Sequence, residues 1–531
     1  MPIVTALSFL GFTLTVALVS YLWVRGTSSS NEADGYFLGG RSLTGWVIAG
    51  SLMLTNLSTE QIVGLNGQGF QAGLAVMAWE TTSGVALVFT ALYLLPRYLK
   101  GGIATISEFL ADRFDEMTRT ISSALFLTGY VVFFLPVVLY SGSLALAEIF
   151  SVADVFGVSD MTALFITVYA IGIVGSIYAI GGGLKAVAVS DTINAVGLII
   201  GGLMIPLFGL YYVGDGDILG GLDTLFDEHP EKFDAKGEPG GLLPFSTLFT
   251  GLMLNQLFYW GTNQAIVQRA FAAKSLAEGQ KGLLIAAFFK VLTPIILVLP
   301  GIIAFHLFAG ELDRPDDAYP RLVSEVLPGW LAGFFAAVLF GAILSSFNSV
   351  LNSSTTLFGV DIYRQYFKAD ASDAEVVRAG KISGFVIAVL AMGVAPFIAY
   401  APSGLFGYLQ QLNGMYAIPI LAVVLVGYFT KRVPAIGAKI ALVVGVVVYL
   451  VSQFVIAPMV GDAYPHFLHV LAVVFILLLA IMFTARYLAP RETPYQLEDK
   501  EVVSADAWRY AKAASVIVTA MVVSTYLIFT G

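Results

Sequence analysis

The chain alternates long apolar runs with short segments in which Gly, Pro and charged residues gather. Most of the runs are about 20 residues or longer, the length that a helix needs to cross a hydrocarbon core of about 30 Å. They lack the in-and-out alternation that is typical of outer-membrane β-barrels. The pattern therefore predicts an all-α integral membrane protein. We expect about 14 transmembrane helices, over residues 3–24, 45–70, 73–96, 120–150, 161–180, 186–213, 245–268, 282–309, 330–363, 379–400, 403–429, 433–456, 464–485 and 510–530.

Composition supports this prediction. Of the 531 residues, 58% are hydrophobic and 12% are charged, and the mean hydropathy is +0.84, whereas soluble domains carry about 25% charged residues. The chain has no cysteine, which excludes disulfide bonds. The first span has no basic segment before it and no small-residue cleavage site after it. We therefore expect a retained helix and not a removed signal peptide.

The positions of Lys and Arg predict the orientation. If the N-terminus lies outside, Lys290 falls inside a span and the only basic residues in outer loops are Lys232, Lys236, Arg314 and Arg321. The remaining Lys and Arg residues, of 27 in all, then fall in inner loops. This asymmetry matches the positive-inside rule. We expect both termini outside.

Several spans carry polar residues at mid-membrane depth. Residues 56–61 are polar except for Leu57, within SLMLTNLSTEQIVGLNGQG. Further clusters occur in AWETTSG of the third span, LMLNQLFYWGTNQ of the seventh and LFGYLQQLNG of the eleventh, and Lys290 stands alone in the eighth. Unsatisfied polar groups in lipid cost several kcal/mol, so such groups face a cavity or pair with one another. Hydrogen bonding between helices is the alternative to ligand binding for any single cluster.

The second and seventh spans each begin a run of five, over residues 45–213 and 245–429. Paired interrupted segments in two halves are typical of inverted-repeat transporters, whose broken helices form a site at the bilayer midplane. Because five is odd, the second run starts from the opposite side of the membrane, as inversion requires. We predict that residues 56–61 mark a break in the second span.

The ninth span carries a stripe of oxygen-bearing side chains. In AAVLFGAILSSFNSVLNSSTTLF, positions Ala342, Ser345, Ser346, Ser349 and Asn352 fall on or near one helix face. Sodium is a hard ion that takes oxygen ligands, a preference that we carry over from calcium and magnesium. A packing face of small residues is the alternative.

The motifs together resemble the sodium/solute symporter family, and within it the bacterial sodium/galactose and the sodium/glucose cotransporters. They are YFLGGRSL, LSTEQIVG, GIATISEFLADRF, IYAIGGGLKAVAVSDTIN, FYWGTNQAIVQRAFAAKS, VLPGIIAF and SSFNSVLNSSTTLFGVDIY, and they cover nearly the whole chain. The resemblance implies a five-plus-five inverted repeat of the leucine-transporter type. In this chain one extra helix and an inner loop occupy 1–44, the first repeat 45–213, an outer loop 214–244, the second repeat 245–429 and three further helices 430–531.

The resemblance also implies the ion ligands. Sodium would bind to the backbone carbonyls of Leu54, Leu57 and Ala342 and to the hydroxyls of Ser345 and Ser346. Some relatives hold a second sodium ion, and the matching positions here are Asp191, Asn348 and Ser349.

For the solute, the resemblance implies a hydrogen-bonding set with an apolar gate. The binding residues would be Gln61, Glu80, Ser83, Gln256, Tyr259, Lys290 and Gln410, and the outer gate Leu65, Trp79 and Phe406. Amides, a carboxylate and an ammonium satisfy the hydroxyls of a sugar, while an aromatic ring stacks on its carbon face. We also expect Lys290 and Glu80 to pair when the site is empty.

These features predict a sodium-driven symporter that imports a small polar solute, in particular a monosaccharide, across the plasma membrane of a bacterium. Its partners would be sodium, the solute and the lipid bilayer, with no nucleic acid. A symporter for a carboxylate or amino-acid-like solute (sialic acid, proline or pantothenate) is the first alternative. An ion channel or membrane sensor is the second, although no repeated filter motif occurs. An enzyme is not expected, because the four histidines, His229, His306, His466 and His469, form no metal signature and no nucleophile elbow appears.

Overall fold

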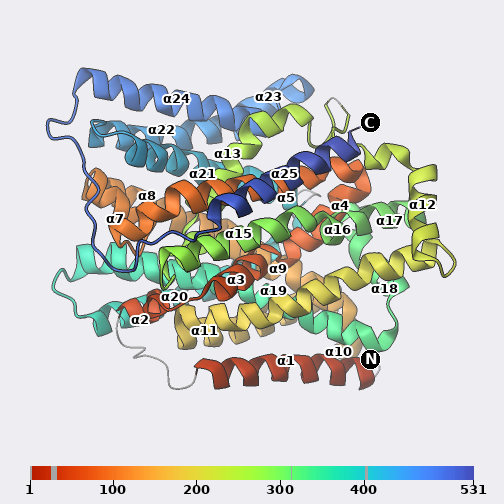
Figure 1. The fold of residues 1–531 in the computed structure, drawn as a ribbon. Coiled ribbons are helices and arrows are strands. Elements are labelled where there is room, and N and C mark those ends of the chain that lie inside the picture. The colour runs from red at the N-terminus through yellow and green to blue at the C-terminus, as the bar shows by residue number, and fades with distance from the viewer. Residues whose placement is uncertain (1–2, 25–32, 239, 313, 401–404, 531) are drawn as a thin grey trace.

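The protein is a bundle of helices, most of which run side by side along one common direction (Figure 1). The computed structural model describes residues 3–24, 33–238, 240–312, 314–400 and 405–530. Within these ranges it has no β-strand, only two isolated bridges, Leu43 with Ala273 and Ser275 with Ser504. The prediction of an all-α fold is confirmed.

Twelve helices form most of the bundle. They are α1 (Ile3–Val24), α5 (Ala78–Phe89), α8 (Glu116–Gly129), α9 (Leu135–Ile149), α11 (Asp160–Val213), α15 (Leu276–Leu292), α19 (Gly329–Thr356), α20 (Asp373–Val394), α21 (Leu405–Phe429), α22 (Ala435–Val451), α24 (Phe467–Leu488) and α25 (Ala511–Phe529). Short π-helical and 3-10 segments extend or join them: η2 (Gly73–Met77), η3 (Thr90–Leu94), η4 (Tyr130–Phe134), η8 (Leu357–Phe367), η9 (Ala395–Tyr400) and η10 (Ser452–Ile456).

Shorter helices lie mainly at the two ends of the bundle or continue the long ones. They are α2 (Ala33–Phe37), α6 (Leu95–Gly101), α7 (Ile106–Arg113), α10 (Val152–Phe156), α12 (Ile218–Glu228), α16 (Pro294–Leu297), α17 (Leu299–Phe308), α18 (Ala318–Val326) and α23 (Ala457–Val460), with the 3-10 turns η1 (Gly39–Arg41), η5 (Pro230–Phe233), η6 (Phe245–Phe249), η7 (Pro315–Asp317) and η11 (Gly461–Ala463).

Ten helical stretches of the described residues are long and apolar enough to cross a membrane. The number is eleven if the bent pair Leu276–Leu292 and Pro294–Phe308, with 45° between its arms, counts as one span. One stretch, Thr59–Gly101, has 43 residues, far more than the roughly 20 that one crossing needs. It contains Gly73 at φ 62°, ψ −145°. The chain is therefore a multi-pass membrane protein, and fourteen spans stay a prediction.

Two of the predicted spans are broken near their middle. α3 (Gly45–Asn56) ends before Leu57, and α4 (Thr59–Ala72) begins after Ser58, whose backbone is extended at φ −84°, ψ 171°. Likewise α13 (Gly251–Gly261) and α14 (Gln264–Phe271) are separated at residues 262–263, where the Asn263 side chain caps α14 by accepting from the backbone N–H of Ala265 at 3.0 Å. The predicted interruption of the second span is confirmed, and its counterpart in the seventh lies at the matching place. The inverted-repeat organisation itself stays a prediction.

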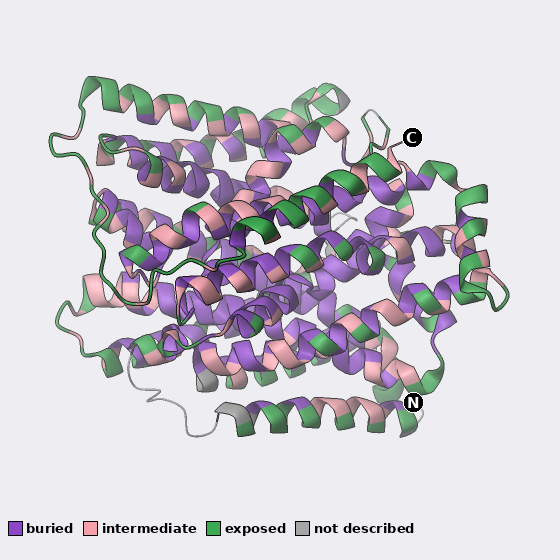
Figure 2. Ribbon diagram, in the orientation of Figure 1, coloured by how far each residue is buried: buried purple, intermediate pink, exposed green. Residues whose placement is uncertain are grey.

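The side chains that face outward from the bundle are largely apolar. Figure 2 shows buried residues in the middle of the bundle and exposed ones along α1, α24 and α25. Exposed residues include Leu7, Leu14, Val473, Ile476 and Leu527, each more than half exposed. Such an apolar surface is unusual for a protein in water and suits contact with lipid.

Both ends of the described chain lie at one end of the bundle. The start of α1, the end of α25 and the helix α12 gather there (Figure 1), and the backbone N–H of Ala235 donates to Phe529 O at 2.8 Å. We call this end the terminal face. Because both ends of the described chain lie on this face, the chain crosses the membrane an even number of times. Which side of the membrane the terminal face meets stays a prediction.

α4 and α17 approach each other closely at a glycine. The backbone N–H of Gly301 donates to Asn66 Oδ1 at 3.0 Å, and a Cβ on Gly301 would lie 2.1 Å from Asn66 O and 2.7 Å from the backbone N of Phe70. Neither contact is possible without moving a backbone. The second half of the broken span is therefore held directly against α17.

We expect Gly301→Ala to destabilise the protein by about 1–3 kcal/mol, because the added methyl forces α4 and α17 apart. The measurement is the thermal unfolding midpoint of the purified protein in detergent. Gly393→Ala is the matched control, since a Cβ there meets nothing within 4 Å. A midpoint for Gly301→Ala equal to that of Gly393→Ala would contradict the close approach.

Candidate functional site

The break in the second span frees two backbone carbonyls. In an uninterrupted helix the backbone N–H of Ser58 would donate to Leu54 O, but it donates to Asn56 O at 2.8 Å. Similarly the N–H of Gln61 donates to Ser58 O at 3.1 Å and not to Leu57 O. Asn and Ser side chains favour such local departures from helix. The carbonyls of Leu54 and Leu57, two predicted sodium ligands, are thus among those that lose their helical donors.

The hydroxyl stripe of α19 packs against the end of α3. Ser346 Oγ donates to Thr55 O at 2.9 Å, and Thr55 Oγ1 and Ser349 Oγ are 3.0 Å apart. Ser345 Oγ is buried and has no hydrogen-bond partner among the described residues. Ala342 is also fully buried. The structure therefore brings the broken helix and the serine pair together, and Ser345 offers an unused oxygen, as a hard-cation site needs.

The three residues predicted for a second ion are divided between two environments. Asp191 accepts from Ser51 Oγ at 2.7 Å and lies 3.9 Å from the guanidinium of Arg269. Arg269 also donates to Ser51 Oγ at 3.0 Å and to Ser349 Oγ. Asn348 Oδ1 is buried without a partner in the described part of the chain and lines a cavity of about 140 Å³ beside α1, which Ser345 also lines. Asp191 and Ser349 are therefore occupied by an internal cation.

Arg269 itself corrects the sequence analysis. Its position predicted an inner loop, but it lies in α14 with none of its side chain exposed. A guanidinium is tolerated there because a carboxylate and several hydroxyl and carbonyl oxygens surround it. The signal that could have found it is its place on the helix that directly follows a predicted polar cluster.

A polar cavity of about 30 Å³ lies beside the break, on the side of α4 and α13. It is lined by Asn56, Glu60, Gln61, Trp79, Ser83, Phe134, Asn255, Gln256, Tyr259, Phe406, Leu409, Gln410 and Asn413. Five of the seven predicted solute residues and two of the three predicted gate residues are among them. Such a volume holds only about two water molecules, so the cavity is closed around its own side chains.

Amide groups of three helices join across the cavity wall. Ser83 Oγ donates to Gln256 Oε1 at 2.9 Å, and Gln256 Nε2 donates to Trp79 O at 2.8 Å. Asn255 Nδ2 donates to Gln410 Oε1 at 3.1 Å. Each pair can exchange its partner for a ligand hydroxyl, because amides offer both donors and acceptors.

Glu80 and Lys290, the other two predicted solute residues, pair behind the cavity wall. Lys290 Nζ donates to Glu80 Oε2 and to Asn56 Oδ1, and Gln61 Nε2 donates to Glu80 Oε1. Both side chains of the ion pair are fully buried, and Thr293 Oγ1 also donates to Glu80. The expected pairing is confirmed, and it is linked to the cavity through Gln61 and Asn56.

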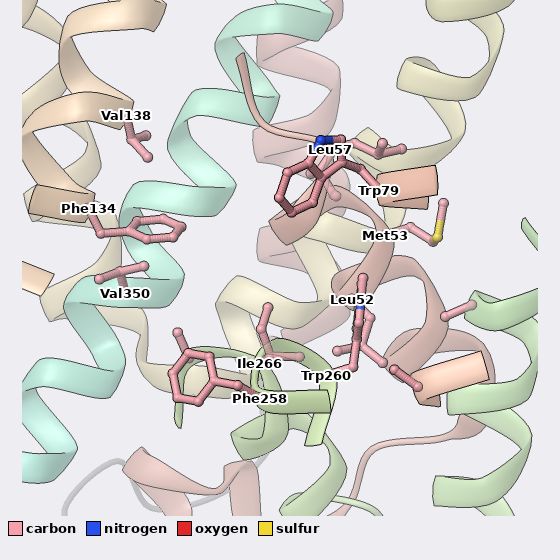
Figure 3. Packing of buried hydrophobic residues seen from close by; sticks show 14 of the residues in the cluster. Leu52, Met53, Leu57, Trp79, Phe134, Val138, Phe258, Trp260, Ile266 and Val350 are labelled. Carbon is pink, nitrogen blue, oxygen red and sulfur yellow. The ribbon is translucent and has the colours of Figure 1, made fainter. Parts of the chain in front are cut away.

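The expected gate is present in part. The rings of Trp79 and Phe406 meet edge to face, with centroids 5.4 Å apart and an interplanar angle of 87°. Phe406 sits directly over Gly64 of α4, where a Cβ would be 2.5 Å from Phe406 Cβ. Leu65 is fully buried and is not among the residues that line the cavity. Figure 3 shows Trp79 and Leu57 among the buried apolar side chains of the core.

Several lining residues had no predicted role. Asn56, Glu60, Asn255 and Asn413 belong to polar clusters that the sequence singles out, and their location in membrane spans is the signal that finds them. Phe134 offers no such signal, because one aromatic residue in an apolar run resembles any other. The same holds for Leu409.

Comparisons with known proteins agree with this geometry. The model of the family described as "Sodium:solute symporter family" matches residues 36–445. The chain is 47% identical to the uncharacterized symporter YidK of Escherichia coli (strain K12), over 98% of this chain and 90% of that protein. It is 35% identical to a sodium/glucose cotransporter of Vibrio parahaemolyticus, over 82% of each chain.

Solved structures show the same fold. A Na+-coupled sialic acid symporter in a substrate-bound, outward-open state is similar with a TM-score of 0.78 at 20% identity, over 92% of this chain and 99% of that one. Mhp1, a nucleobase-cation-symport-1 family transporter in a closed conformation, is similar with a TM-score of 0.57 at 15% identity, over 92% and 99%. The resemblance seen in the sequence motifs is thereby confirmed, and the chain belongs to the sodium:solute symporter family.

Proposed function

We propose that this protein is a sodium-driven symporter that imports a monosaccharide by alternating access. The observation that carries the proposal is that one break serves two sites. On its α3 side, Thr55 O accepts from Ser346 of the α19 serine pair, one residue after Leu54, and on its α4 side Gln61 lines the polar cavity. An ion that orders the break therefore also orders the cavity wall, which is a reciprocal coupling between the two ligands.

For the ion, we propose the carbonyls of Leu54, Leu57 and Ala342 and the hydroxyls of Ser345 and Ser346 as ligands. The freed carbonyls and the unpartnered Ser345 Oγ support this set. We propose one coupled sodium ion and not two, because Arg269 already supplies a positive charge to Asp191 and a hydrogen bond to Ser349.

One ion is energetically sufficient. One charge that moves through about 100 mV releases about 2.3 kcal/mol, and a tenfold sodium gradient adds about 1.4 kcal/mol. Together they support an accumulation of the solute of roughly several hundredfold.

For the solute, the charges near the cavity favour a neutral polyol over a carboxylate. A carboxylate solute needs a free cation or a free helix N-terminus. Lys290 is already held by Glu80 and Asn56, and Glu60 lies in the first turn of α4. The amides of Gln61, Gln256 and Gln410 line the cavity and are neutral, so a sugar hydroxyl can replace their present partners without separating charges. The sodium/glucose cotransporters among the relatives agree with a sugar.

The sialic acid symporter among the similar structures keeps an anionic sugar as the second candidate. It would require Lys290 to leave Glu80 on binding. For location, we propose the inner membrane of a bacterium, with the terminal face outside. The five-plus-five repeat over residues 45–213 and 245–429, flanked by one helix and three, is part of the same proposal.

The direct test is uptake into liposomes that contain the purified protein, with a panel of monosaccharides and sialic acid. We expect accumulation of at least one neutral monosaccharide with an inward sodium gradient and none with potassium. Uptake should rise with sodium concentration at a Hill coefficient near 1, as one ion requires. Sodium-driven uptake of sialic acid alone would overturn the neutral sugar, and sodium-independent uptake would overturn the mechanism.

Replacing the unpartnered hydroxyl tests the ion site. We expect Ser345→Ala to raise the sodium concentration for half-maximal uptake by about tenfold, because one ligand oxygen is lost at a cost of about 1–2 kcal/mol. Ser354→Ala is the matched control on the same helix, since Ser354 Oγ is buried and donates only to Val350 O. Equal sodium dependence in the two variants would remove Ser345 from the site.

Two neighbouring glutamines test the solute site. Gln410 lines the cavity. Gln411 points to the neighbouring segment η10, where its Nε2 donates to Gln453 Oε1 at 2.8 Å. We expect Gln410→Ala to raise the solute KM by about tenfold, the cost of about one hydrogen bond, while Gln411→Ala leaves KM near the wild-type value. The sodium requirement should stay unchanged in both. An unchanged KM in Gln410→Ala would contradict the assignment.

A further inference from the structure

Two histidines and a glutamate meet on the terminal face, far from the cavity. Glu228 ends α12, His229 follows it, and His306 lies in the last turn of α17. One ligand atom from each of the three lies within 4.8 Å of the others. His229 and His306 are 77 residues apart in the chain, so no short motif marks the group.

Two of the three distances between the ligand atoms match the edges of a zinc coordination tetrahedron, and the third is no longer than 4.8 Å. Zn–N bonds of about 2.0–2.1 Å at tetrahedral angles place two ligand atoms about 3.3 Å apart. His229 Nε2 and His306 Nδ1 are 3.2 Å apart, and His306 Nδ1 and Glu228 Oε2 are 3.4 Å apart. Two histidine nitrogens and one carboxylate oxygen also form a ligand set that zinc commonly takes, with water as the fourth ligand.

A second carboxylate stands behind one of the histidines. Glu231 Oε1 lies 3.7 Å from His229 Nδ1, the ring nitrogen that faces away from the cluster. Metal-bound histidines usually donate their other ring N–H to such a carboxylate, which fixes the ring and its tautomer. The His229 ring is further held edge to face against Phe305, with centroids 5.2 Å apart.

Lys232, a basic residue close to the cluster in the chain, directs its ammonium group to the end of α4. Lys232 Nζ donates to Phe70 O at 3.0 Å and to Gln71 O at 2.8 Å, at the end of α4, and lies 3.7 Å from the centre of the Phe305 ring. The carboxylates of Glu231 and Glu238 offset its charge. The same contacts tie this loop to α4, the helix that carries Gln61 into the cavity.

We propose that Glu228, His229 and His306 form a binding site for a divalent transition metal of the zinc class on the terminal face, with Glu231 as the group that positions His229. A bound ion would join α12 to α17 by coordination bonds. Because Lys232 holds the adjacent turn on α4 and Gly301 holds α17 on α4, the ion would also restrain the movement of α4, and uptake would slow.

The binding test uses the purified full chain in detergent and titration calorimetry with ZnCl₂, with MgCl₂ as the comparison ion. We expect one zinc ion per chain and no binding of magnesium, which takes oxygen ligands in octahedral geometry. His306→Ala and His229→Ala should each weaken zinc binding by at least tenfold, and Glu231→Gln by about tenfold or more. His306→Gln, which keeps a hydrogen-bonding group, guards against a folding defect.

The matched control is His469→Ala, because His469 contacts Ser246 and Thr250 in another part of the chain. It should bind zinc as the wild type does. Absence of zinc binding to the wild type, or zinc binding that survives in both His306 variants, would overturn the site and leave the histidine contact as a plain hydrogen bond.

The effect on uptake rests on the proposed function and is measured separately. Zinc on the side of the terminal face should lower the uptake rate of the wild type severalfold and leave that of His306→Gln unchanged. If zinc binds but uptake is unaffected, the restraint on α4 is wrong. If no uptake occurs under any condition, the proposed function fails while the calorimetric result for the site stands.

Discussion

The structure depends on one constraint, that a backbone group at the middle of a bilayer has no water to bond with. A helix can open there only where other parts of the protein accept and donate in place of its lost neighbours. At residues 56–58 this role falls to α19, whose Ser346 donates to Thr55 O, and to Lys290, which donates to Asn56 Oδ1. The oxygens of Thr55 and Asn56 thus have protein donors, whereas Ser345 Oγ on α19 has no partner among the described residues.

The buried charges follow the same rule. Glu80 with Lys290 and Asp191 with Arg269 are each fully surrounded by hydroxyls and amides. Burying one charge alone costs several kcal/mol even after relaxation, whereas a well-bonded pair recovers most of that cost. Both pairs touch the break, the first through Asn56 and the second through the hydroxyls of Ser51 and Ser349. The broken helix is therefore held between two neutral pairs.

Much of this arrangement could be predicted from the sequence, because lipid imposes a strict composition. An apolar run gives α1 its observed bounds at 3–24, and a polar cluster inside such a run places the break at 56–61. The polar lining of the cavity follows from the same reasoning, since an amide within a span must face something polar. Motif resemblance added the pairing of these clusters with the serines of α19.

Other features required the tertiary structure. Arg269 looks like an inner-loop residue until α14 places it beside Asp191. Phe134 and Leu409 line the cavity only because η4 and α21 present those faces, and nothing in an apolar run marks them. The contact of His229 with His306 depends on how α12 lies against α17. In each case the feature arises because two segments that are distant in the sequence approach each other in the fold. Neither the periodicity of a segment nor a local motif indicates such an approach.

The size of the cavity has a consequence for affinity. Ligand pockets usually occupy about 300–1,000 Å³, and the space enclosed by Trp79, Phe406 and the amides is about 30 Å³. A cavity of this size is too small for the proposed monosaccharide, so binding of such a solute would require a more open conformation of the protein. The apparent dissociation constant would then equal the intrinsic dissociation constant divided by the fraction of protein in the open conformation. Substitutions that loosen the contact of Phe406 with Gly64 would raise the population and tighten binding without touching the solute.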